Sequence, residues 1–215
     1  MAERPAPALY VLAGTNGAGK SSIGGEQFRR SGSDYFNPDE ATRRILQANA
    51  GLSPDEANGH AWQQGRRLLE RAIAERKNFA FETTLGGNTI PRLLARAAAS
   101  GIEVRMWYAG LASPELHLAR VRARVAKGGH DIPEAKIRQR YEDSRLHLVD
   151  LVSFLTELYV YDNSVEAGAA GQAAPELVLH ALRGKILAPR NLSRTPNWAK
   201  PIVAAALRDP RAQGH

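Results

Sequence analysis

The chain of 215 residues has no cysteine, and none of its apolar runs approaches the ~20 residues that a membrane-spanning helix needs. Without cysteine there is no disulfide framework, no thiolate metal site and no cysteine nucleophile, which fits a reducing compartment. The apolar run near the N-terminus is short and leads directly into a glycine-rich loop, unlike a signal peptide. We therefore expect a cytoplasmic protein without a membrane segment.

The chain also lacks a basic tail and any stretch in which basic and aromatic residues alternate, although its net charge is +7 at pH 7. The arginines are spread along the sequence, which argues against a nucleic-acid partner and favours phosphate-rich small ligands. Its length predicts a single domain over residues 1–215. We expect the core over about 8–188 and an irregular, proline-punctuated tail over 189–215.

Strands alternate with helices along the chain, which predicts an α/β fold with a parallel sheet and helices on both faces. The aromatic residues Trp62, Trp107 and Tyr108 are expected in the core rather than as base-stacking platforms. Short apolar runs predict strands at 8–13, 35–36, 78–83, 103–111 and 158–161. Helices are predicted up to about residue 30, at 38–50, 54–77 and 90–99, from 113, at 134–153 and 175–182, and near Val203.

The most informative motif, GTNGAGKSS, follows the first predicted strand and has the phosphate-loop pattern G-x-x-x-x-G-K-S. Its glycines let successive N–H groups point into one concavity, and the following helix adds its positive end. Lys20 would reach the β- and γ-phosphates of ATP or GTP, and Ser21 would hold Mg²⁺. The predicted nucleotide-binding residues are Gly14, Thr15, Asn16, Gly17, Ala18, Gly19, Lys20, Ser21 and Ser22.

Polar residues follow the second and third predicted strands, where ligands of a parallel sheet bind. Asp39 could deprotonate an acceptor hydroxyl, although an aspartate near a helix start also complements the helix dipole. A buried, unpaired Glu82 would be costly, so we expect it to hold a magnesium-bound water, a substrate hydroxyl or an arginine. A structural hydrogen bond to a neighbouring loop is the alternative. Thr83 and Thr84 add hydroxyl groups.

Two later predicted helices carry several arginines and are joined by the glycine-containing turn GGHDIP at 128–133. This arrangement predicts a helical lid over a transferring phosphate, because planar guanidinium groups neutralise charge on phosphoryl oxygens. For each arginine the alternative is a solvated surface position. The candidates are Arg120, Arg122, Arg124, Arg138, Arg140 and Arg145.

Together these segments resemble the zeta-toxin family. The resemblance is carried by the phosphate loop, by YFNPD at 35–39, by FETTL at 81–85 and by the arginine-rich stretch at 120–144, and it covers roughly residues 8–164. It is closest to a short bacterial branch often labelled as predicted ABC-type ATPases. The chain has no LSGGQ-like signature, so that label does not fit it.

Zeta toxins are similar to P-loop small-molecule kinases. The resemblance therefore implies transfer of a γ-phosphate to a hydroxyl of a nucleotide sugar, UDP-N-acetylglucosamine in the best-known members. It implies nucleotide and Mg²⁺ binding by Lys20 and Ser21, a catalytic base at Asp39, and sugar binding at Glu82 and Thr84. It also suggests a small helical antitoxin as partner.

The resemblance further implies two charge-neutralising arginines within residues 120–140. Arg124 is the first candidate, Arg138 and Arg140 compete for the second position, and Arg120 is a candidate for substrate binding. Two rival functions stay open at this point. The first is a kinase for a nucleoside, an antibiotic or a nucleic-acid end, and the second is a nucleotide-gated interaction protein without transfer activity.

Overall fold

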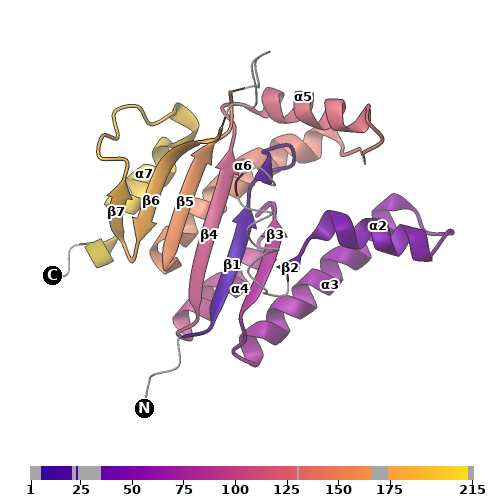
Figure 1. Ribbon diagram of the computed structural model, residues 1–215, viewed down its shortest axis with the longest axis horizontal. Helices are drawn as coiled ribbons and strands as arrows, with labels where there is room; N and C mark the ends of the chain where they lie inside the picture. The colour runs from indigo at the N-terminus through magenta and orange to yellow at the C-terminus, as the bar shows by residue number, and fades with distance from the viewer. Residues whose placement is uncertain (1–5, 21–22, 24–34, 130, 166–173, 213–215) are drawn as a thin grey trace.

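The computed structural model describes residues 6–20, 23, 35–129, 131–165 and 174–212. Its strands form one sheet in the order β2-β3-β1-β4-β5-β6-β7 (Figure 1). The strands are β1 (Ala8–Ala13), β2 (Tyr35–Phe36), β3 (Phe79–Thr83), β4 (Glu103–Gly110), β5 (Glu157–Asp162), β6 (Glu176–Leu182) and β7 (Lys185–Ala188).

The first five strands pair in parallel, as the alternating pattern predicts. The predicted helix over 175–182 is wrong, because these residues form β6, which pairs antiparallel with β5. A two-residue turn at Arg183 and Gly184 then leads into β7. Both turn residues have positive φ, 47° and 83°, as a tight type I′ hairpin requires. The exposed edge of β5 thus supplies backbone partners that outweigh the local helical signals.

The described helices are α2 (Pro38–Ala48), α3 (Pro54–Ala74), α4 (Thr89–Ala99), α5 (Pro114–Val125), α6 (Glu134–Leu151) and α7 (Lys200–Leu207). Capping residues fix where α2 and α3 begin. The Asn37 side chain accepts hydrogen bonds from the first turn of α2, and Ser53 and Glu56 form a capping box at α3. The predicted helix ending near residue 30 lies outside the described residues. No described helix is long and apolar enough to cross a membrane.

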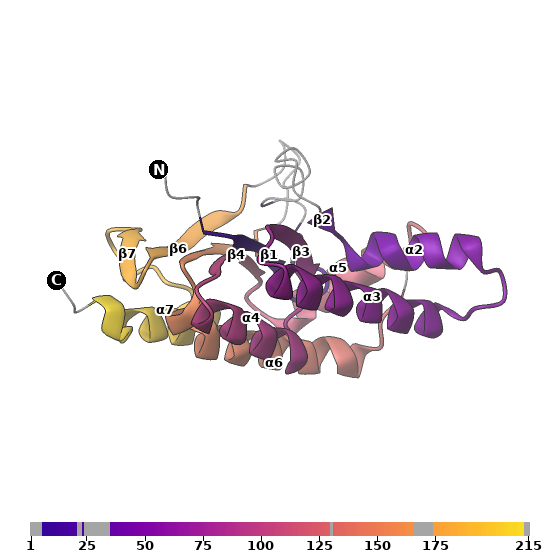
Figure 2. The same ribbon diagram turned by 90° about the horizontal axis from the view of Figure 1, so that it is seen from below.

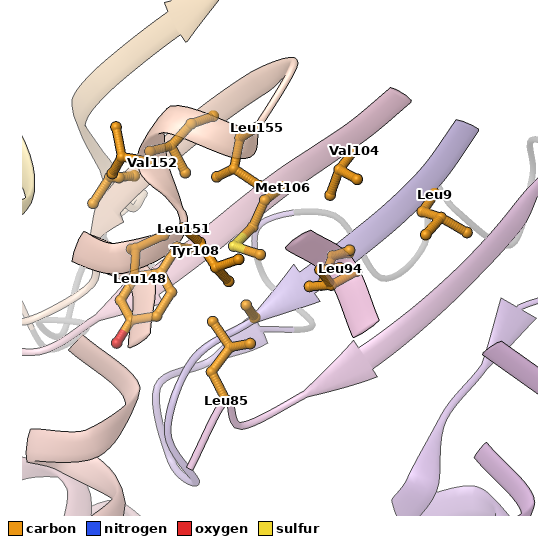
Figure 3. Close-up of a cluster of buried hydrophobic side chains, with 14 of the residues drawn as sticks. Leu9, Leu85, Leu94, Val104, Met106, Tyr108, Leu148, Leu151, Val152 and Leu155 are labelled. Carbon is orange, nitrogen blue, oxygen red and sulfur yellow. The ribbon is translucent and has the colours of Figure 1, made fainter. Parts of the chain in front are cut away.

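Helices α4, α6 and α7 cover one face of the sheet (Figure 2). Alternate residues of β4 point into this core, where Met106 and Tyr108 lie with Leu94 of α4 and Leu148 of α6 (Figure 3). Full burial of each such side chain contributes about 1.5–3 kcal/mol. The C-terminal segment takes part as well, since Trp198, Ile202 and Val203 are all buried in the same cluster.

Two helix pairs frame the carboxyl ends of the parallel strands (Figure 1). The pair α2 and α3 extends from the β2 edge of the sheet, and α5 lies beyond the end of β4, where it packs against α6. The α5–α6 pair carries the predicted arginines, so the helical arginine-bearing element is present as expected. The two pairs therefore face the strand ends from which the predicted site residues project.

Candidate active site

The phosphate loop leaves β1 through glycines that no other residue could replace without strain. Gly14, Gly17 and Gly19 have φ values of 138°, 81° and 78°, which L side chains rarely adopt. A Cβ at Gly14 would lie 2.3 Å from the carbonyl oxygen of Ala109, and one at Gly17 would lie 2.9 Å from that of His117. The loop packs so closely against β4 and α5 that positions 14 and 17 require glycine.

Two residues from distant parts of the chain hold the loop carbonyls. The Nδ1 of His117 donates to the oxygen of Asn16 at 2.8 Å, and the side-chain amide of Asn163 donates to the oxygen of Ala18 at 2.9 Å. Burial lowers the pKa of His117 to about 4, so its ring is neutral at pH 7. Sequence reasoning missed both residues. The strand-end rule could have found Asn163, directly after β5, but no sequence signal marks His117.

Lys20 lies in the same charged neighbourhood as the other site residues. Its Nζ donates to the carbonyl oxygen of Gly14 at 3.0 Å. Burial lowers the pKa of Lys20, the charges of Arg124 and Arg140 lower it further, and Glu82 and Asp39 oppose the shift. A phosphate group bound here would restore the favourable environment of the ammonium group.

Glu82, at the end of β3, is buried and hydrogen-bonded. Its Oε1 accepts from the Tyr35 hydroxyl and, at 2.9 Å, from the side-chain amide of Asn37. These bonds join the end of β3 to β2 and to the cap of α2, so the structural hydrogen bond considered as an alternative is present. Because they use one carboxylate oxygen, a substrate role for Glu82 stays a prediction.

The loop after β3 turns sharply at a buried leucine. The hydroxyl oxygens of Thr83 and Thr84 accept hydrogen bonds from the amides of Leu85 and Gly86, at 3.1 and 3.4 Å. Leu85 has a φ of 52°, which is uncommon for a leucine, yet its side chain is 1% exposed in the core. This turn directs the threonines towards the cavity described below.

Asp39 meets an arginine from the opposite helix pair. Its carboxylate is 69% exposed on the first turn of α2, and its Oδ2 lies 3.5 Å from Nη1 of Arg124 on α5. Arg140 of α6 donates to the Asn16 side-chain oxygen at 2.7 Å. Burial lowers the pKa of Arg140, and the charge of Asp39 opposes this shift. The two arginines therefore link the phosphate loop with the strand-end carboxylates.

Two glycines make room for the aliphatic stems of these arginines. A Cβ at Gly86 would lie 2.5 Å from Cγ of Arg140, and one at Gly129 would lie 2.7 Å from Cγ of Arg124. Gly86 belongs to the loop after β3, and Gly129 belongs to the turn after α5. A side chain at either glycine would therefore collide with the stem of the arginine beside it.

One cavity of about 720 Å³ brings these groups together, a size that suits a small-molecule ligand. Of the predicted site residues it is lined by Asn16, Asp39, Glu82, Thr83, Thr84, Arg124 and Arg140.

Four of the six predicted arginines, namely Arg120, Arg122, Arg138 and Arg145, do not line this cavity. Arg120 donates to the backbone oxygen of Asn163 at 2.7 Å, behind the phosphate loop. Arg138 pairs with Glu115 and Glu134 on the surface, at 2.7 and 2.9 Å. Ser21 and Ser22 lie outside the described residues.

The expectation that Trp62 belongs to the core is wrong. Its side chain is 45% exposed and lines the cavity from α3. Tyr108 is buried as predicted, whereas the ring of Trp107, half-buried, stacks on Tyr159 with centroids 5.3 Å apart. The helical spacing of Trp62 with Leu69 and Ile73 was compatible with burial, but the spacing alone does not show how far the α2–α3 pair extends beyond the sheet.

No cluster of three or more metal-ligating side chains occurs among the residues that the structure describes. A Mg²⁺ ion that is bound together with a nucleotide takes one or two protein oxygens and completes its shell with phosphate and water. Asp39 and Glu82 are carboxylates close to Lys20, so the oxygen donors present fit such an ion.

A phosphate loop after the first strand, a carboxylate facing it and arginines over the shared cavity define a P-loop phosphotransferase of the kinase type. Residues 1–164 match the family model described as Zeta toxin. The chain belongs to the zeta toxin family, as the sequence motifs indicate.

The chain is also similar to one curated protein and to several solved structures. An uncharacterized protein of Haemophilus influenzae is 33% identical over 129 residues, which are 60% of this chain and 88% of that protein. The solved AvrRxo1-ORF1:AvrRxo1-ORF2 complex with sulphate ions has the same fold, with a TM-score of 0.68 and 14% identity. That match covers 92% of this chain and 64% of the solved one.

The solved PezAT chromosomal toxin-antitoxin system of Streptococcus pneumoniae also shares the fold, with a TM-score of 0.51 and 16% identity. The match covers 75% of this chain and 70% of the solved chain. At such low identity these likenesses establish the architecture only, and the α/β P-loop kinase fold predicted from the sequence is confirmed.

Proposed function

We propose that the protein transfers the γ-phosphate of ATP to a hydroxyl group of a small molecule, and that the acceptor is a nucleotide sugar such as UDP-N-acetylglucosamine. The observation that carries this proposal is the single cavity in which Asn16 of the phosphate loop and Asp39 face Arg124 and Arg140. Membership of the zeta toxin family supports it. A structure of the AvrRxo1 complex with ATP, a fold relative, supports ATP as the donor.

On the donor side, the loop amides and Lys20 hold the β- and γ-phosphates. Ser21 is the residue that we assign to Mg²⁺, which supplies charge neutralisation between the phosphates. The hydrogen bonds from His117 and Asn163 hold the carbonyl oxygens of Asn16 and Ala18. They thus fix the loop backbone, to which we assign the binding of the phosphate anion.

On the acceptor side, Asp39 takes the proton of the acceptor hydroxyl. The freed oxygen forms a bond to the γ-phosphorus, the bond between that phosphorus and the β,γ-bridging oxygen breaks, and ADP leaves. Arg124 and Arg140 neutralise the charge that spreads over the transferring phosphoryl oxygens. We assign the second arginine to Arg140 rather than Arg138, because Arg140 lines the cavity and Arg138 does not.

The same family relation supports two further proposals. Because solved fold relatives come from complexes and from a toxin-antitoxin system, we propose a small helical antitoxin as partner. The cytoplasm, which supplies ATP and nucleotide sugars, is the compartment in which we propose that the protein acts.

Replacement of Asp39 by asparagine tests the proposed reaction. The variant keeps the size of the side chain but cannot accept the proton, so transfer should fall by about 10²–10⁴-fold while ATP affinity is retained. Asp150→Asn, at an exposed position of α6 away from the cavity, is the matched control. Unchanged transfer by Asp39→Asn would refute the role of Asp39 as base.

A screen of acceptors tests the substrate. γ-Labelled ATP is incubated with UDP-sugars, nucleosides, antibiotics and an oligonucleotide, and the labelled product is separated. Label on a UDP-sugar supports the proposal, and label on another acceptor supports the first rival kinase function. ATP binding without labelled product from any class would favour the nucleotide-gated interaction protein.

A further inference from the structure

The α2–α3 side of the cavity contains an indole ring in an unusual position. Asn58, Trp62, Gly65 and Arg66 line the cavity from one face of α3, as their spacing of three and four residues allows. A Cβ at Gly65 would lie 2.5 Å from the ring of Phe36, which also lines the cavity. Phe36 and Trp62 thus give this wall two aromatic rings.

Leaving Trp62 45% exposed forfeits part of the stability that burial of a large ring supplies. An exposed aromatic ring is informative when it lines a cavity of ligand size, since such cavities use aromatic walls to bury flat groups. The ring lies beside a cation as well, because the guanidinium carbon of Arg66 is 5.7 Å from the Trp62 ring centroid.

Arg66 has unused donor capacity beside this ring. Its Nε–H is buried and has no hydrogen-bond partner, although Nε forms an ion pair with Oε1 of Glu70 at 3.9 Å. An unsatisfied buried donor is costly in a folded protein unless a ligand or water completes it. Arg66 also lines the cavity, where its guanidinium group can donate to an anionic oxygen of a bound molecule.

We infer that Trp62 and Arg66 form the specificity site for the acceptor, in which Trp62 stacks on a planar heteroaromatic ring and Arg66 binds an adjacent anionic oxygen. This inference rests on the proposed function, since it places the acceptor in the same cavity. The inference implies that a good acceptor must carry a heteroaromatic ring. A sugar phosphate that offers the same hydroxyl without a base leaves the indole uncovered and loses the stacking energy.

Two variants and two acceptors test this site. With UDP-N-acetylglucosamine, Trp62→Ala should raise the KM for the acceptor about ten- to a hundredfold, and Trp62→Phe should raise it less. With N-acetylglucosamine 1-phosphate, which lacks the uridine, Trp62→Ala should change the KM little. The KM for ATP should stay constant throughout. Equal losses for both acceptors, or equally efficient use of both by the unchanged protein, would overturn the inference.

Binding measured without transfer separates this inference from the proposed function. Uridine, cytidine, adenosine and guanosine monophosphates are titrated in the presence of a saturating non-hydrolysable ATP analogue, and tryptophan fluorescence is recorded. At least one should quench the signal of the unchanged protein and of the control Trp107→Phe, but not that of Trp62→Phe. Quenching without transfer would refute only the proposed function, whereas no Trp62-dependent quenching by any of the four would refute the stacking site.

Discussion

The two sides of the cavity are built differently. On the donor side, backbone atoms of the phosphate loop are held by buried hydrogen bonds from His117 and Asn163, which come from α5 and from the end of β5. On the acceptor side, the carboxylate of Asp39 is largely exposed, and its contact with Arg124 reaches across from the opposite helix pair. The described part of the phosphate loop is therefore held by contacts within the protein, whereas the acceptor side is formed by more exposed side chains.

This difference predicts which kinetic constant each residue controls. A fixed loop contributes to nucleotide binding before the reaction begins, so its supporting residues should affect the KM for ATP. Side chains that neutralise charge only in the transition state of phosphoryl transfer should affect kcat. The predictions below test this separation, beginning with the largest expected effect.

The strongest test concerns the two arginines that line the cavity. Arg124→Ala and Arg140→Ala should each lower kcat by about a hundredfold or more, because each removes a charge that stabilises the transferring phosphoryl group. Steady-state kinetics with saturating ATP and acceptor measures this. Arg138→Ala should lower kcat by much less, and Arg208→Ala, at an exposed position after α7, is the surface control. A larger loss for Arg138 than for Arg140 would reverse our assignment of the second arginine.

The next test weakens the donor side alone. Asn163→Ala leaves the buried carbonyl of Ala18 without its 2.9 Å hydrogen bond. The cost of such an unsatisfied group is about 1–3 kcal/mol, so the KM for ATP should rise roughly tenfold. The KM for the acceptor should not change, and both constants are obtained from initial rates. A rise in the acceptor KM of the same size would show that the two sides are not independent.

A smaller effect is expected from the pH dependence of stability. His117 has a pKa of about 4 in the folded protein because it is buried, against about 6.5 when unfolded. Above pH 6.5 both states are neutral, and as the pH falls towards 4 only the unfolded state gains the proton. Folding stability should thus fall by about 2 kcal/mol between pH 7 and pH 5 from this residue.

The comparison uses His117→Asn, which keeps a donor near Nδ1 but does not titrate. Urea unfolding of both proteins at pH 7 and pH 5 gives the difference. The loss of stability at pH 5 should be smaller in the variant by about the amount stated above. An equal loss in both proteins would show that His117 is protonated in the fold or reached by water.

Much of this architecture could be predicted from local signals. The phosphate loop, the caps at Asn37 and Ser53 and the apolar strands depend on neighbouring residues, and the structure has them in place. The strand β6 could not be predicted, because its apolar residues suit a helix as well and only the free edge of β5 decides between them.

The candidate site was predictable at the ends of strands and less so on helices. A carboxylate after a parallel strand points to the site edge, so Asp39 and Glu82 could be named. The rotation of α6 and the space left by Gly86 decide which arginine of α6 reaches the cavity. The spacing of residues in the sequence specifies neither. The exposure of Trp62 follows from the placement of α3 beyond the sheet, which the spacing of residues does not specify either.

The buried side chain of Leu85 joins the catalytic edge to the interior of the molecule. Its backbone turns the loop that carries Thr83 and Thr84, and its side chain lies with Leu94 and Tyr108 in the core (Figure 3). The position of the acceptor groups is therefore set partly by the packing of residues that no ligand touches. A core substitution that displaces Leu85 would therefore also displace Thr83 and Thr84 at the cavity.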